Sequence, residues 1–148
     1  MPSEDNAAPL LTGRCYCGFF TLKAGAAPDT VAYCHCSDCR RLTGAPVGAF
    51  AAFKPSDIDL KPVLGDGATH NPGVRRWFCH KCGSPIAAQF DYLPDQIYVP
   101  LGIIDQADAL APQIHCYWQN RLSWLQLEDS LEKSERSART TLIQSLRP

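Results

Sequence analysis

The apolar positions of this chain fall into short segments that alternate with turns rich in Gly, Pro and Asp. Most of these segments carry branched or aromatic residues. Segments of this kind predict β-strands, and their close succession along the chain predicts an all-β architecture. The expected strands cover residues 19–23, 31–34, 47–53, 58–61, 74–79, 86–90, 97–102 and 114–118.

Helical structure is expected only as short turns between these strands. Ser37 is a suitable N-cap for one or two helical turns that end at Leu42, because Gly44 and Pro46 interrupt a helix. A single helical turn is also expected over residues 105–110.

The two ends of the chain differ in composition from its middle. Residues 1–9 are polar and rich in proline, which predicts a flexible N-terminus, and residues 10–128 form the expected domain. Residues 129–148 form a charged tail. A weak helical stripe over residues 128–146 predicts a C-terminal helix, with a solvated tail as the alternative. The stripe consists of Leu131, Ala138, Leu142 and Leu146.

The composition is that of a soluble globular domain. The 148 residues are 45% hydrophobic and 20% charged, which suits one domain with a core of its own. A net charge of -1 gives no electrostatic reason to expect a nucleic acid or an anionic membrane as partner. No apolar run reaches the ~18 residues of a membrane span, and residues 1–12 lack the features of a signal peptide. We therefore expect a cytoplasmic protein with reduced thiols.

Seven of the eight cysteines lie in three tight clusters. The even number makes disulfides an alternative, but a Cys-X-Cys loop meets disulfide geometry only with strain. Thiols one or two residues apart can instead reach one metal ion from a single turn of backbone. The clusters are Cys15 with Cys17, Cys34 with Cys36 and Cys39, and Cys79 with Cys82.

Two of these clusters have two thiols each and together can close a tetrahedral zinc site. Cys79 and Cys82 have the spacing of a zinc knuckle, and the glycine after them permits a positive φ in the turn. Cys15 and Cys17 also need a turn, because alternate residues of a strand point to opposite faces. A closed site with four thiolates is structural, and folding depends on it.

The third cluster, Cys34, Cys36 and Cys39, is one ligand short of a closed site. Three protein ligands leave the fourth position to substrate, as is typical of catalytic zinc. A thiol bound there would lose its proton and become a nucleophile at neutral pH. Arg40 and Arg41 follow at once and add positive charge.

The spacing leaves a closed second site open as an alternative. Cys116, His35, His80 or His115 would then supply the missing ligand, and both zinc ions would be structural. Cys116 otherwise has the character of a small buried hydrophobe. If both neighbours of His35 bind the ion, the imidazole ring between them points away from it.

The order of these motifs resembles the glutathione-dependent formaldehyde-activating enzyme family, also called the centromere-protein-V/GFA domain. The resemblance covers residues 10–128. It rests on G-x-C-x-C-G at 13–18, C-H-C-x-x-C-R-x-x-T-G at 34–44, C-x-x-C-G-S at 79–84 and H-x-x-W at 115–118, with Trp124 beyond. It implies a twisted, mostly antiparallel β fold of the Mss4-like type with two zinc ions per chain.

The resemblance also implies a division of labour between the clusters and a reaction. The implied reaction joins a small thiol to a small aldehyde: glutathione, as co-substrate, adds to formaldehyde to give S-hydroxymethylglutathione, a carbon–sulfur lyase reaction in reverse. By analogy, Cys15, Cys17, Cys79 and Cys82 hold a structural zinc, and Cys34, Cys36 and Cys39 hold a catalytic zinc.

No motif in the chain is specific for the carboxylates of glutathione. Arginines are the candidates for contacts with the thiol substrate, because a guanidinium group pairs with a carboxylate. These candidates are Arg40 and Arg41 beside the third cluster, and Arg75 and Arg76.

Two other functions are alternatives to an enzyme. A zinc scaffold that captures thiols or a protein partner without turnover would use the same fold. A chromatin or cytoskeletal module, like the centromere-associated relatives, is disfavoured by the near-neutral charge. An exchangeable ligand at the second zinc distinguishes the enzyme from the scaffold.

Overall fold

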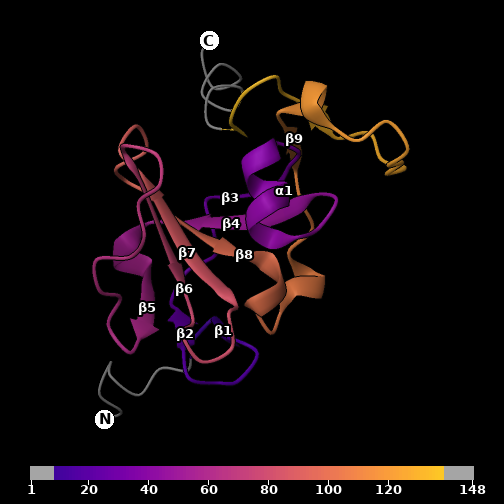
Figure 1. Cartoon of the computed structure of the whole chain (residues 1–148). Coiled ribbons are helices and arrows are strands. Elements are labelled where there is room, and N and C mark those ends of the chain that lie inside the picture. Colours follow the sequence, from indigo (N-terminus) through magenta and orange to yellow (C-terminus); the bar gives the residue numbers. More distant parts are fainter. Residues whose placement is uncertain (1–8, 139–148) are drawn as a thin grey trace.

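Two β-sheets build the protein, and they confirm the mainly β fold that the sequence predicts (Figure 1). The computed structural model of the chain describes residues 9–138. The smaller sheet has three antiparallel strands in the order β1-β2-β5. They are β1 (Leu11–Arg14), β2 (Thr21–Ala24) and β5 (Ile58–Lys61).

The larger sheet has seven strands in the order β10-β9-β3-β4-β8-β7-β6. It is mixed, because β9 runs parallel to both β3 and β10 while the other pairs are antiparallel. Each segment that was predicted as a strand overlaps one strand of the two sheets. The strands of the larger sheet are β3 (Thr30–Cys34), β4 (Gly48–Phe53), β6 (Val74–Phe78), β7 (Pro85–Phe90), β8 (Ile97–Pro100), β9 (Ile114–Cys116) and β10 (Glu132–Lys133).

Helical structure within residues 9–137 is confined to α1 (Ser37–Thr43) and short 3-10 turns. The N-cap of α1 is Cys36 and not Ser37 as predicted, because Sγ of Cys36 accepts a hydrogen bond from N–H of Cys39. Gly44 ends the helix at φ 71°. None of the helices in the described range has the length and hydropathy that a bilayer crossing requires. The 3-10 turns are η2 (Pro55–Asp57), η3 (Leu101–Ile103), η4 (Ala107–Ala109) and η5 (Trp118–Asn120).

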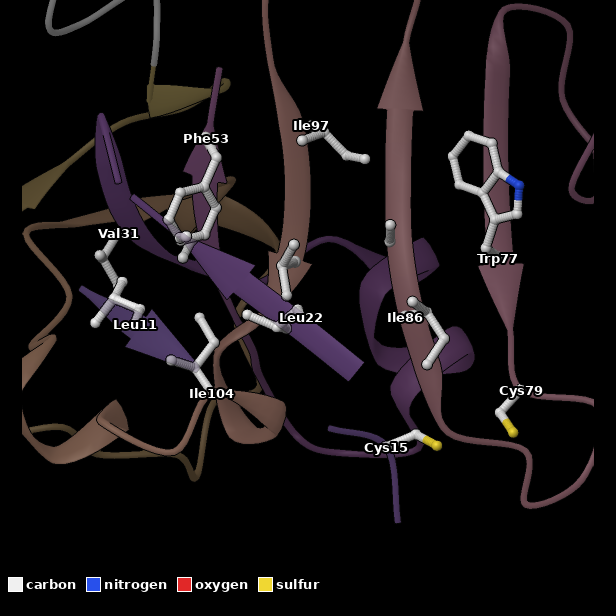
Figure 2. Close-up of a cluster of buried hydrophobic side chains, with 14 residues drawn as sticks. Leu11, Cys15, Leu22, Val31, Phe53, Trp77, Cys79, Ile86, Ile97 and Ile104 are labelled. Atoms are coloured by element: carbon white, nitrogen blue, oxygen red, sulfur yellow. The ribbon is translucent and has the colours of Figure 1, made fainter. Parts of the chain in front are cut away.

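Side chains from both sheets form one apolar core (Figure 2). Leu22 of the smaller sheet packs in the same cluster as Phe53 and Ile86 of the larger sheet, and all three are fully buried. Burial of one such side chain contributes about 1.5–3 kcal/mol to stability. Cys15 and Cys79 lie at one end of this cluster, at the lower edge of Figure 2. The core therefore anchors one thiol from each of two separate turns.

Strand β1 is not predicted by the apolar pattern, because Leu11 is the one apolar residue in its sequence LTGR. Tertiary contacts hold it in place. A Cβ atom at Gly13 would lie 2.3 Å from the carbonyl oxygen of Ile103, so only glycine allows this approach. In addition, N–H of Thr12 donates to Oε1 of Gln106 at 2.9 Å. Thr12 and Gln106 are 94 residues apart in the sequence. Contacts with a distant part of the chain therefore hold β1, the strand before the first cysteine pair.

The predicted C-terminal helix is not found over residues 128–137. The chain there is extended, because its polar groups find partners on the domain. Strand β10 pairs with β9, and N–H of Ser134 donates to the carbonyl oxygen of His115 at 2.8 Å. Ala138 is buried against Ala32 and Ile114. Residue 138 is helical, and residues 139–146 of the predicted helix lie outside the described range.

Candidate metal centres

A four-thiol cluster lies at one end of the apolar core. Cys15 and Cys17 belong to the turn between β1 and β2, and Cys79 and Cys82 belong to the turn between β6 and β7. All four sulfur atoms lie within 4.8 Å of one another. Sγ of Cys17 is 3.7 Å from Sγ of Cys15 and 3.7 Å from Sγ of Cys79, although Cys17 and Cys79 are 62 residues apart in the sequence. The fold thus brings together the two thiol pairs.

Glycines and backbone amides shape both turns of this cluster. Gly18 and Gly83 have φ angles of 83° and 78°, in the left-handed region that favours glycine. Following the first turn, N–H of Phe20 donates to Sγ of Cys15 at 3.3 Å. Hydrogen bonds of this kind offset part of the negative charge that four thiolates place around one cation.

The hydroxyl group of Ser84 connects the two turns. It lies 3.2 Å from Sγ of Cys82 and accepts a hydrogen bond from N–H of Tyr16 at 3.0 Å. The bond with Ser84 lowers the pKa of the Cys82 thiol to about 5. Cys82 therefore favours the thiolate form that a metal ion requires.

The sulfur spacing of the four-thiol cluster fits zinc. A tetrahedral Zn²⁺ ion with Zn–S bonds of about 2.3 Å has ligand sulfurs about 3.8 Å apart. Both measured separations of 3.7 Å match this value. Four thiols fill all four positions of a tetrahedron, so the cluster has the ligand set of a structural zinc site.

A three-thiol cluster lies where β3 runs into α1. Cys34 ends β3, Cys36 is the N-cap of α1, and Cys39 lies in the first turn of the helix. Their sulfur atoms lie within 4.8 Å of one another. Sγ of Cys34 is 3.4 Å from Sγ of Cys36 and 3.1 Å from Sγ of Cys39. The strand end and the helix cap together turn three thiols toward one point.

The charge state of this second cluster suits a cation. Hydrogen bonds from the thiols of Cys34 and Cys39 lower the pKa of Cys36 to about 2. Hydrogen bonds with Cys36 and Cys39 in turn raise the pKa of Cys34. One thiolate is thus held beside two thiols at neutral pH. A divalent cation provides the positive charge that lets all three lose their protons, so the donor set fits a metal ion.

None of the residues suggested as a fourth ligand completes the second cluster within residues 9–138. His35 and His115 bond to each other, and His80 packs against the ring of Phe19. Cys116 pairs in register with Cys34 across β9 and β3, but it does not join the three sulfurs. The described residues therefore favour an open second site over a closed one.

A cavity of about 300 Å³ adjoins the three thiols. Aromatic side chains from several strands and loops contribute to its wall. Cys116 and Ala138 also reach the cavity, from β9 and from the segment after β10. The aromatic residues of the wall are Phe50, Phe90, Tyr92, Tyr98 and Tyr117.

The arginine at the cavity is Arg76 of β6, one of the four arginines considered from the sequence. Arg40 and Arg41, the two predicted contacts of the thiol substrate, do not line this cavity. Both lie in the last turn of α1, and Nε of Arg40 is buried with no hydrogen-bond partner within residues 9–138. Arg75 donates to Gln89 at 2.8 Å and does not line the cavity.

A hydrogen-bonded chain of two buried histidines and the carboxylate of Asp129 lies behind the second cluster and was not predicted. The carboxylate of Asp129 accepts from Nε2 of His115 at 3.0 Å, and Nδ1 of His115 lies 2.8 Å from Nε2 of His35. A carboxylate can only accept, so Nε2 of His115 carries a hydrogen. In the tautomer with its one hydrogen on Nε2, Nδ1 of His115 accepts from Nε2–H of His35. The His35 ring thus points away from the thiols on either side of it, as expected. From the sequence, His115 was considered in the H-x-x-W motif and as a fourth ligand of the second cluster, but not as part of this chain.

We expect His35 to stay neutral in solution, with its hydrogen on Nε2. Burial, with smaller contributions from His115 and Arg121, lowers the pKa of His35 to about 4. Nitrogen NMR of the imidazole rings in the zinc-loaded protein checks this. At a pH about one unit above the pKa of His35, its ring should be mainly neutral, with its hydrogen on Nε2. A His35 ring that titrates near the ordinary pKa of about 6.5 would contradict the buried chain.

Comparison with known proteins finds a matching family and a similar solved structure. A family model described as glutathione-dependent formaldehyde-activating enzyme matches residues 10–120. Among solved structures, a crystal structure of a Rhodobacter sphaeroides protein, determined as a structural genomics target, is 21% identical with a TM-score of 0.50. The match covers 83% of this chain and 98% of that chain, and at this identity it shows the fold alone. No curated protein matches the chain.

Proposed function

The chain belongs to the glutathione-dependent formaldehyde-activating enzyme family, and from this premise we propose a zinc-dependent enzyme that joins a small thiol to a small aldehyde. The reaction is that of a carbon–sulfur lyase in the direction of condensation. Its substrates would be glutathione and formaldehyde, the thiol and the aldehyde in the family name. One observation carries the proposal. Three thiols line a cavity, and no fourth ligand completes their cluster within residues 9–138.

In this proposal the two clusters have different roles. The four-thiol cluster holds a structural zinc, which its closed ligand set and its place on the apolar core support. The ligands of the catalytic zinc are Cys34, Cys36 and Cys39. Zinc, when bound by these three residues, would lower the pKa of an incoming thiol and leave one position for that thiol.

The remaining chemistry falls to the groups around the cavity. The thiol sulfur forms a bond to the carbonyl carbon, the π electron pair of the C=O bond moves to oxygen, and the thiol proton ends on that oxygen. Burial raises the pKa of Tyr117 to about 12, and burial also raises the pKa of Tyr92. Both phenols therefore keep their hydrogens at neutral pH. They share one hydrogen bond with each other, so one of the two hydrogens can be donated to the developing alkoxide.

Exchange NMR on a mixture of glutathione and formaldehyde tests the proposed reaction. Glutathione and its hydroxymethyl adduct interconvert without a catalyst at neutral pH. The measured quantity is therefore the exchange rate and not the yield. We expect the zinc-replete protein to raise this rate in proportion to its concentration, and protein stripped of metal to have no effect. Binding of glutathione without any change in the exchange rate would favour a scaffold that captures thiols. Absence of both binding and acceleration would exclude glutathione as the substrate.

A further inference from the structure

The cavity beside the three-thiol cluster is small and largely apolar. Its volume of about 300 Å³ lies at the lower end of the ~300–1,000 Å³ of small-molecule sites. The five aromatic rings in its wall come from β4, β7, β8 and two loops. A wall of this kind buries the apolar body of a ligand well and offers few hydrogen bonds to polar groups.

The charged groups at this cavity are few. Among residues 9–138, Arg76 is its one cation and Asp38 its one carboxylate. The guanidinium group of Arg76 lies 5.5 Å from the centroid of the Phe90 ring and forms no ion pair within residues 9–138. It is close enough to Cys39 to interact with that thiol electrostatically. The part of the chain that the structure describes therefore places one cation without an ion pair near both the thiols and the aromatic wall.

Glutathione does not match this wall well. The tripeptide carries two carboxylates, one ammonium group and two amides, and an extended tripeptide needs more room than a compact aromatic thiol. One guanidinium group can pair with only one of its carboxylates. Groups left without a partner in an apolar cavity lose their hydration without compensation, which weakens binding.

We infer that the site selects a thiol with a compact apolar or aromatic body and a single carboxylate, which pairs with Arg76. This inference rests on the proposed function, because it takes the three-thiol cluster as the place where the thiol sulfur binds. The aromatic wall buries the body of the ligand, and the guanidinium group forms a charge-assisted pair with the carboxylate. The carbon–sulfur bond forms as proposed above, with the same movement of electrons and proton.

Titration of the cobalt-substituted full-length protein with three thiols tests the inference. Cobalt in a thiolate site has absorption bands that change when a further thiol binds, so the titration reports affinity without turnover. The thiols are 4-(mercaptomethyl)benzoate, its uncharged primary amide, and glutathione. We expect the benzoate to bind at least about tenfold more tightly than the amide or glutathione, because only the benzoate combines an aromatic body with one carboxylate.

Arg76→Gln should remove this preference. The affinity for the benzoate should fall about tenfold toward that of the amide, and the affinity for the amide should stay the same. Arg75→Gln is the matched control, since Arg75 precedes Arg76 on β6 and does not line the cavity. Arg76→Lys keeps the charge without the two-pronged geometry, so it should give an intermediate affinity for the benzoate. Circular dichroism and metal content of each variant show that it is folded.

The outcomes separate this inference from the proposed function. If none of the three thiols changes the cobalt spectrum, thiol binding at the second cluster is wrong, and the inference fails with it. If glutathione binds as tightly as the benzoate, or if Arg76→Gln weakens the benzoate and the amide equally, the inference is overturned while the proposed reaction stands.

Discussion

Replacement of Cys17 with Ser is expected to unfold the domain. Cys17 is exposed, so its side chain contributes little to the apolar core, yet its sulfur lies 3.7 Å from two other thiols of the four-thiol cluster. A structural zinc site contributes about 10–16 kcal/mol in small zinc domains. The total stability of a domain is about 5–15 kcal/mol. Loss of one ligand therefore weakens a contribution that is as large as the whole free energy of folding.

Thermal unfolding and zinc content together measure this effect. The Cys17→Ser protein should show no cooperative transition, or one far below that of the wild type, and should lose the zinc of the four-thiol cluster. Cys116→Ser is the control, because Cys116 is buried but belongs to neither cluster. This substitution places one polar group in an apolar site, which should lower the free energy of unfolding by about 1–3 kcal/mol. A Cys17→Ser protein that melts like the wild type would show that the first cluster is not a structural metal site.

The grouping of the thiols could be predicted from the sequence because it depends on short spacings. Two cysteines that are one or two residues apart stay close in any tight turn, and a following glycine indicates where the turn lies. Gly18 and Gly83 do have the positive φ angles that this reasoning requires. The N-cap of α1 was predicted one residue late, since a thiol is a less familiar cap than the hydroxyl of Ser37.

The surroundings of the second cluster could not be predicted, because they depend on contacts between distant parts of the chain. The cavity wall takes residues from most strands of the larger sheet, and no local pattern shows that Arg76 and Tyr117 share it. Asp129 reaches His115 only because the segment after residue 128 packs along β9. The sequence pattern of that segment is weakly helical, but parallel pairing with β9 and a buried hydrogen bond outweigh this local preference.

Substitution of Cys36 is expected to abolish the acceleration of thiol exchange and leave the domain folded. Cys36 belongs to the three-thiol cluster, which lies apart from the four-thiol cluster and has no fourth ligand within residues 9–138. Cys36→Ala should therefore lose one of two zinc ions per chain. The remaining zinc should resist mild chelation, because a closed site exchanges its metal more slowly than an open one.

Comparison of Ala and Ser at position 36 separates the effect of metal loss on stability from the effect of losing the helix cap. Sγ of Cys36 caps α1 by accepting from N–H of Cys39, and loss of an N-cap costs about 0.5–2 kcal/mol. Ser is a good N-cap but a poor zinc ligand, so Cys36→Ser should match the wild type in stability more closely than Cys36→Ala does, while both lose the second zinc.

Exchange NMR and thermal melts of the same samples check both expectations. Neither Cys36 variant should raise the exchange rate of glutathione and formaldehyde above the uncatalysed rate. The wild type supplies the comparison. If Cys36→Ser instead unfolds as completely as Cys17→Ser, the domain needs the second cluster for its stability as much as it needs the first. Both zinc sites are then structural, and the three thiols cannot be the place where a substrate thiol binds.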